Sequence, residues 1–254
     1  MTIPEKTWLN YIDRLRKVND AAETRMEEYL RTHALETYAQ RQALIDYAYA
    51  VATRYGEGAA ELACEMYDAL GLASEVILPA AEPAGTATIG EVAKTVNGTM
   101  KVSNDIEVIA SSVARLVKMA GVDTTMENAI RDRAEWAWIP HGDTCAFCIA
   151  LSSRGWQRAS SEAMNGGHAE HIHANCDCTY AVRFKKDTKF GGYEPEEYRE
   201  IYDEAEGGSA RKKINAMRRE FYAENKERIN AQKRSAYAKR QERESSRAEE
   251  MNVN

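Results

Sequence analysis

Apolar residues recur at spacings of three and four through most of the first 137 residues, which is the pattern of amphipathic helices. The pattern predicts helices over about 5–31, 35–55, 56–71, 104–120 and 123–137, with Gly71 as the C-cap of the third. Between them, LPAAEPAGTATIG at 78–90 contains two prolines and two glycines and predicts a linker or exposed loop. No strand-like alternation occurs before residue 138. The first half of the chain is therefore expected to be a helical bundle.

The pattern changes at Pro140 and Gly142, which end the helical region. The segment 141–184 is rich in turn residues, and its last part, CTYAVRF, has the β-branched and aromatic content of a strand. Beyond Pro195 the pattern is helical again, strongly charged and poor in apolar residues. We therefore expect a mainly α protein with three parts: a helical domain (1–137, with a linker at about 78–100), a small β-hairpin-like module (138–190) and a charged helical tail (191–254).

Composition is consistent with a helical protein that works outside membranes. Hydrophobic residues make up 44% of the chain, charged residues 29%, and the mean hydropathy is -0.59. No run of about 18 apolar residues occurs, and the first 20 residues lack a signal-peptide core. These features predict a chain kept in a reducing cytoplasm. In that compartment, clustered cysteines bind metal more often than they form disulfides.

The formal net charge of -6 conceals an uneven distribution. Residues 194–206 (EPEEYREIYDEAE) hold seven acidic residues and one arginine. Residues 211–247 hold 13 lysines and arginines against five acidic residues, so this stretch carries +8 and leaves -14 for the rest of the chain. The change of sign near Gly207 and Gly208 marks a change of environment.

The basic tail allows two interpretations. Its lysines and arginines at 211–247 are candidate contacts for packaged double-stranded DNA, which would make the chain a nucleic-acid-binding adaptor. The alternative is a solvated helix whose charges pair at i and i+4, for example through Glu220 and Glu224. The sequence leaves both open.

Candidate metal ligands gather in one short region. Four of the five cysteines and three of the five histidines lie between residues 145 and 178, in CAFC and in HAEHIHANCDC. Two residues between cysteines let both thiolates face one tetrahedral ion, and a His–Cys pair brought back by the chain completes four ligands. Zinc suits such a mixed sulfur and nitrogen set. The firmer ligands are Cys145, Cys148 and His173, the fourth is Cys176 or Cys178, and the fallbacks are His168 and His171.

The supply of ligands bears on whether the ion is catalytic. A catalytic zinc needs an open coordination position and a neighbouring acid or base. Here the candidates outnumber the four places, so we expect a closed, structural zinc and no enzymatic activity. The H-x-E of His168 and Glu170 is similar to that of zinc deaminases, but the accompanying P-C-x-x-C is missing from the sequence. The stronger enzymatic alternative is an HNH-like nuclease that uses His168 or His171 with Asn175.

At these residues the sequence resembles the minor head (Mu F-like) proteins of tailed bacteriophages. The resemblance rests on a polar turn, C-x-F-C, SRG, a serine-rich stretch, H-x-N-C-x-C and a strand, present here as HGDTCAFCIALSSRGWQRASSEA and HANCDCTYAVRF within 141–184. TRYGEGAAELACEMYDAL at 53–70 is also similar to a helical segment of that family. The resemblance covers about half of the chain, and the tail after residue 190 lies outside it.

The resemblance implies a low-copy structural protein of the phage head. Its partners would be the portal protein and the major capsid protein, and it would act in head assembly and in DNA packaging or ejection. It would be assembled in the host bacterial cytoplasm and then reside in the virion, in the head interior, without membrane contact.

Overall fold

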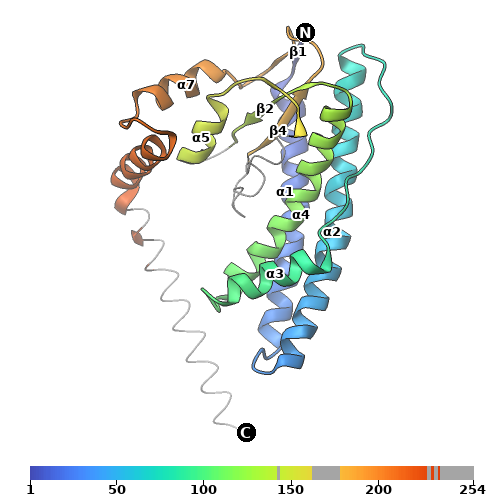
Figure 1. Ribbon diagram of the computed structural model, residues 1–254, viewed down its shortest axis with the longest axis vertical. Coiled ribbons are helices and arrows are strands. Elements are labelled where there is room, and N and C mark those ends of the chain that lie inside the picture. The colour runs from blue at the N-terminus through green and yellow to red at the C-terminus, as the bar shows by residue number, and fades with distance from the viewer. Residues whose placement is uncertain (142–143, 162–177, 228–229, 232–233, 235–254) are drawn as a thin grey trace.

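A bundle of long helices carries a small sheet at one end, with a further group of helices beside the sheet, as the computed structural model in Figure 1 shows. The structure describes residues 1–141, 144–161, 178–227, 230–231 and 234. The protein is mainly helical, as the sequence predicts. Within these described ranges, no helix has the length and apolar character needed to cross a membrane.

Three long helices form the bundle: α1 (Glu5–Thr32), α2 (Tyr38–Ala73) and α4 (Ile106–Arg131). The shorter helix α3 (Ile89–Met100) packs against α2 and α4. α2 and α3 each begin with a capping box, in which Thr37 and Thr88 accept hydrogen bonds from the backbone three residues ahead. The buried faces of the four helices meet in one core, whose members include Met26, Leu44, Val92, Ile109 and Val117.

The two helices expected over 35–55 and 56–71 are a single helix, α2. Gly56 does not interrupt it, because this residue is buried where the helix touches Thr86. A Cβ at Gly56 would lie 2.9 Å from the Thr86 Cγ2. The helix also runs past Gly71, the expected C-cap, to Ala73. Packing between elements thus overrides the two glycines, at which the sequence predicts helix ends.

The stretch expected as a linker is held against the bundle. Residues 78–88 have no regular secondary structure, but side chains of α4 bind their backbone. The Asn128 amide accepts a hydrogen bond from the Glu82 N–H at 3.0 Å and donates one to the Glu82 carbonyl at 2.8 Å. Thr124 accepts one from the Ala84 N–H at 3.0 Å. These polar side chains replace the backbone hydrogen-bond partners that an irregular segment lacks. The rest of the expected linker forms α3.

The helix expected over 123–137 ends early. α4 stops at Arg131, and Arg133 adopts a left-handed conformation (φ 55°) that turns the chain. The next residues, EWAWI, form the strand β2 (Glu135–Ile139). The expectation of no strand before residue 138 is wrong, because β2 is buried on both faces and therefore shows no polar alternation.

β2 is the central strand of a three-stranded antiparallel sheet with the order β3–β2–β4. β4 (Thr179–Arg183), the strand predicted from CTYAVRF, pairs along the whole of β2, and β3 (Gln157–Arg158) pairs with its first two residues. A separate parallel pair joins β1 (Thr2–Ile3) to β5 (Lys189–Phe190). The domain boundary expected at 137/138 falls within β2, so the sheet includes residues on both sides of it.

The sheet separates two apolar clusters. One contains Trp136 and Trp138, which contact Tyr180 edge to face with ring centroids 4.8 and 4.7 Å apart, and it continues onto α4 through Val122 and Met126. The other contains the alternate strand residues Ala137, Ile139 and Ala181 together with Trp8, Tyr11 and Phe190. The helical bundle and the sheet therefore share their hydrophobic cores.

Helices α5 (Ala146–Ser152) and α7 (Pro195–Glu204) pack together beside the sheet, and residues 210–227 form a further helix. This last helix places Ile214 and Met217 in a small apolar cluster with α5. The Lys213 ammonium donates to the carbonyl oxygens of Tyr202 and Asp203 at 2.9 and 2.8 Å, at the C-terminal end of α7. A positive charge is favourable there because of the helix dipole.

Two glycines test the contact between α2 and α4. A Cβ at Gly121 would lie 3.2 Å from the Ala59 carbonyl oxygen, whereas a Cβ at Gly58 would have nothing within 4 Å. We expect Gly121→Ala to lower the free energy of unfolding by about 1–3 kcal/mol, because the two helices must separate. Gly58→Ala should raise it by about 0.5–1 kcal/mol through helix propensity. Urea unfolding followed by circular dichroism measures both, and equal stabilisation by the two changes would contradict the close helix contact.

Candidate metal centre

The first two candidate ligands lie together at the start of α5. Cys145 is the N-cap residue of this helix and Cys148 lies in its first turn. N-cap and N3 side chains lie on the same side of a helix end, so the C-x-x-C spacing brings both thiols to one place. Their Sγ atoms are 3.6 Å apart, and Cys148 is buried while Cys145 is partly buried.

The distance between the two sulfur atoms suits a tetrahedral zinc. Two thiolates bound at about 2.3 Å with a tetrahedral angle between them are about 3.8 Å apart. The observed separation of 3.6 Å is close to that value, whereas a disulfide requires ~2.0 Å. This pair therefore needs little adjustment to hold one ion.

Cys178 lies directly before β4 and is 2% exposed. It belongs to the apolar cluster that also contains Cys148 and Tyr180. In the part of the chain that the structure describes, however, no three His, Cys, Asp or Glu side chains lie close enough to hold a metal ion. Cys178 therefore does not complete a three-ligand group with Cys145 and Cys148, and the described residues alone form no metal site.

The other candidate ligands lie outside the described residues. These are His168, His171, His173 and Cys176, together with Glu170 and Asn175, which entered the enzymatic alternatives. The full ligand set, and the choice between Cys176 and Cys178, stay predictions.

An aromatic core surrounds the buried side of the cysteine pair. Cys148 shares its cluster with Trp136, Trp138, Tyr67 and Tyr180, and Cys145 packs against the same cluster. An apolar shell of this kind limits solvent access and strengthens the attraction between an ion and its thiolates. Sequence reasoning missed the two tryptophans because it assigned them to a helix. The signal that could have found them is the short apolar run WAWI, which follows the charged RDRAE.

Asp123 of α4 carries a perturbed carboxyl group. Burial raises its pKa from 3.8 to about 6, and the negative charges of Glu127 and Glu91 add to the shift. Burial also raises the pKa of the Tyr180 hydroxyl above its usual range, and the charge of Asp123 adds to that effect. The region between α4 and β4 therefore disfavours negative charge.

This carboxyl group makes stability depend on pH. Because the pKa of Asp123 is higher in the folded than in the unfolded chain, stability is lost as pH rises from about 4 to about 6. Asp123→Asn should raise the free energy of unfolding at pH 7 by about 1–3 kcal/mol and leave it nearly unchanged at about pH 3. Glu127→Gln, at an exposed neighbour, is the control and should have a smaller effect. Urea titrations at the two pH values measure the difference, and an equal gain at both would contradict the raised pKa.

The SRG triplet forms the turn that follows α5. Gly155 has a left-handed conformation (φ 63°), and a Cβ there would lie 3.4 Å from the Cβ of Pro195, the first residue of α7. The Ser153 carbonyl accepts a hydrogen bond from the Arg199 Nε at 3.2 Å. The turn is therefore specified by backbone conformation and by its contact with α7.

Comparison with known protein families places these features in context. The model of the VG15 protein family matches residues 2–205, about four fifths of the chain. The chain belongs to the VG15 protein family. This is a family of viral proteins. No curated protein and no solved structure gives a match.

The VG15 match covers the bundle, both sheets, the cysteine pair and the SRG turn, and it ends one residue after α7. The helix over 210–227 and the rest of the basic tail therefore lie outside it. The viral family agrees with the phage resemblance in the sequence.

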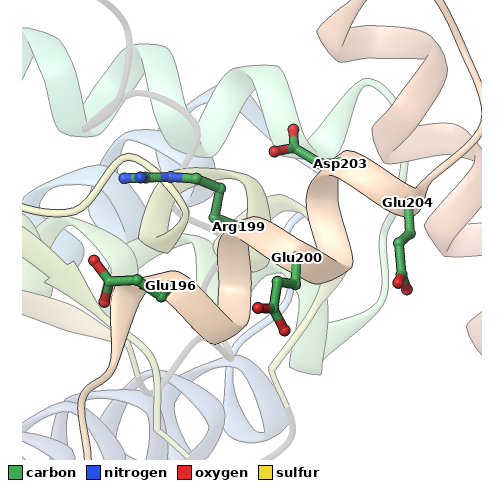
Figure 2. Close-up of a pocket in the computed structure, with 5 residues that line it drawn as sticks. All are labelled: Glu196, Arg199, Glu200, Asp203 and Glu204. Atoms are coloured by element: carbon green, nitrogen blue, oxygen red, sulfur yellow. The ribbon is translucent and has the colours of Figure 1, made fainter.

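The last helix of the VG15 part has an acidic outer surface. An open depression of about 510 Å³ lies along α7. Its lining residues, drawn in Figure 2, are Glu196, Arg199, Glu200, Asp203 and Glu204. The carboxylates point in different directions along the helix and do not converge on one point. This depression is therefore an acidic surface rather than a second ion site.

Proposed function

We propose that this VG15 protein is a minor structural protein of a tailed-phage head, located in the head interior and associated with the portal and major capsid proteins. The observation that carries the proposal is the family match over residues 2–205, combined with the head-protein signature at 141–184. The described signature residues support it, because they serve packing and chain turning. Cys148 lies in the core, Gly155 forms a turn with a left-handed backbone conformation, and Tyr180 contacts two tryptophans.

We further propose that a zinc ion completes this signature segment. Cys145 and Cys148 supply two thiolates at a suitable separation, and His173 with either Cys176 or Cys178 supplies the remaining ligands. When bound, the ion would join α5 to the segment that leads into β4. Its role is structural, so the protein acts by binding and not by catalysis. The domain would then already be folded when it binds its partner proteins during head assembly in the host cytoplasm.

Genetic complementation tests this function. Inactivating the gene in the phage that encodes it should reduce the yield of infectious particles and leave phage DNA replication unchanged. Supplying the wild-type protein from a plasmid should restore the yield. The His168→Ala, His171→Ala double variant should restore it equally well, because the structural proposal requires neither side chain. Failure of this variant while it is expressed and folded would favour the HNH-like nuclease, and a normal yield without the gene would reject the head function.

A further inference from the structure

The helix over residues 210–227 presents a basic face to solvent, and we propose that this face binds the phosphate backbone of double-stranded DNA. The segment lies beyond residue 205, where the VG15 match ends. The inference therefore goes beyond the proposed head function and does not rest on it.

The helix docks on the body of the protein through one side. Ala216 and Met217 are buried, and Lys213 and Ile214 are partly buried. Met217 and Ile214 pack with α5, and Lys213 binds the end of α7. This docking fixes which side of the helix faces away from the protein.

The outward side carries basic residues and no acidic ones. At about 100° per residue, the exposed basic side chains fall within an arc of about 120°. Asn215 and Tyr222 are the other residues in that arc. The three acidic residues of the helix, Glu220, Glu224 and Glu227, lie on the side of Lys213. The basic arc consists of Arg211, Lys212, Arg218, Arg219 and Lys226.

Within residues 210–227, all of which the structure describes, the charged side chains form no salt bridge with each other. Among the described residues, the salt bridge of the helix joins Lys213 to Asp203 at 3.9 Å, and none of the five arc residues forms one. Glu220 and Glu224, the acids expected to neutralise the helix at i and i+4, point to the other side. Within residues 210–227, the positive charge of the arc is therefore available to a partner, as the first of the two interpretations requires.

The composition of the arc favours a nucleic acid over a protein partner. A protein interface needs a buried apolar centre, usually with aromatic or aliphatic anchors. The arc has Tyr222 and no aliphatic residue, whereas Ile214 and Met217 are used for docking on α5. Phosphate binding needs mainly lysine and arginine in a row. From Arg211 to Lys226 the face is about 22 Å long, over which duplex DNA presents on the order of 13 phosphates.

The test compares two charge-matched variants of the full-length protein. The first is the triple substitution Arg211→Gln, Arg218→Gln, Arg219→Gln on the proposed face. The second removes the same charge from exposed positions of α1, through Arg14→Gln, Arg16→Gln and Lys17→Gln. The probes are labelled duplexes of about 25 base pairs in two unrelated sequences, titrated by fluorescence anisotropy between about 50 and 200 mM NaCl.

Wild type and the α1 variant should bind both duplexes alike, with an affinity that falls steeply as salt rises. The triple variant on the face should bind at least 10-fold more weakly at low salt, and its slope of log K against log salt should be less negative by up to about 2.7. Absence of DNA binding by the wild type overturns the proposal, as does equal binding by the two variants. A change of sedimentation in the face variant with unchanged DNA binding would assign the face to the acidic α7 of a second copy instead.

Discussion

Removing zinc should abolish hydrogen-exchange protection in residues 144–161 and leave α2 and α4 protected. α5 has seven residues and β3 has two, and elements this short depend on their attachment to the rest of the protein, to which the proposed zinc contributes. The long helices are held by their own core, which includes Leu44 and Val117. The measurement is hydrogen exchange before and after chelation, on protein whose zinc content has been determined by elemental analysis. We expect about one zinc per chain, in line with the single four-ligand set.

Cysteine variants provide the matched control for chelation. The double variant Cys145→Ser, Cys148→Ser should lose both the zinc and the protection. Cys64→Ser, a change at the α2 cysteine outside the candidate site, should lose neither. Protein that contains no zinc and takes up none on reconstitution would refute the metal centre. Equal loss of protection in the bundle and in 144–161 would show that the two regions unfold as one unit.

Trp138→Ala should be among the most destabilising single substitutions, lowering the free energy of unfolding by about 3–5 kcal/mol. Trp138 is 1% exposed and contacts Tyr180 at a centroid distance of 4.7 Å, between the bundle and the sheet. Its removal leaves a cavity that two layers of structure cannot easily close. Thermal or urea unfolding monitored by circular dichroism measures the loss, and a decrease in melting temperature of roughly 10 °C is expected for a chain of this size.

A conservative change at the same position separates packing from hydrogen bonding. The indole N–H of Trp138 is buried and has no hydrogen-bond partner among the described residues. Trp138→Phe removes this unsatisfied donor as well as part of the ring, so the two effects oppose each other. We expect a loss well below that of the alanine variant. Similar losses for Phe and Ala would contradict the packing account, because the aromatic ring that Phe retains would then contribute nothing to stability.

Periodicity identified the parts of the fold that have one solvent face. α1 was predictable because its apolar residues, such as Trp8 and Ile12, recur on one stripe. β4 is buried on both faces and was predictable from its β-branched and aromatic composition instead. β2 was not predictable from periodicity, because it is buried on both faces. Its sequence, one acidic and four apolar residues, fits a helix as well as a strand. The length of α2 depends on the contact of Gly56 with Thr86, which no local pattern contains.

Some features of the candidate site were also predictable from the sequence, whereas others required the tertiary structure. The C-x-x-C spacing alone was enough to predict that the Cys145 and Cys148 thiols lie side by side, because two residues that are three positions apart in a tight turn share one side of it. The raised pKa of Asp123 depends on burial by other elements and on Glu91 of α3, so it required the tertiary structure. The direction of the basic face in 210–227 likewise required the docking of Met217, although its positive charge was evident from the sequence.

The central claim is that this VG15 protein is a component of the virion, and mass spectrometry of purified particles tests it most directly. Virions of the encoding phage, banded by density and treated with protease on the outside, should contain peptides of this chain at low copy relative to the major capsid protein. Protection from the protease would place the protein inside the head. If the chain is abundant in infected cells and missing from such particles, the head assignment is contradicted.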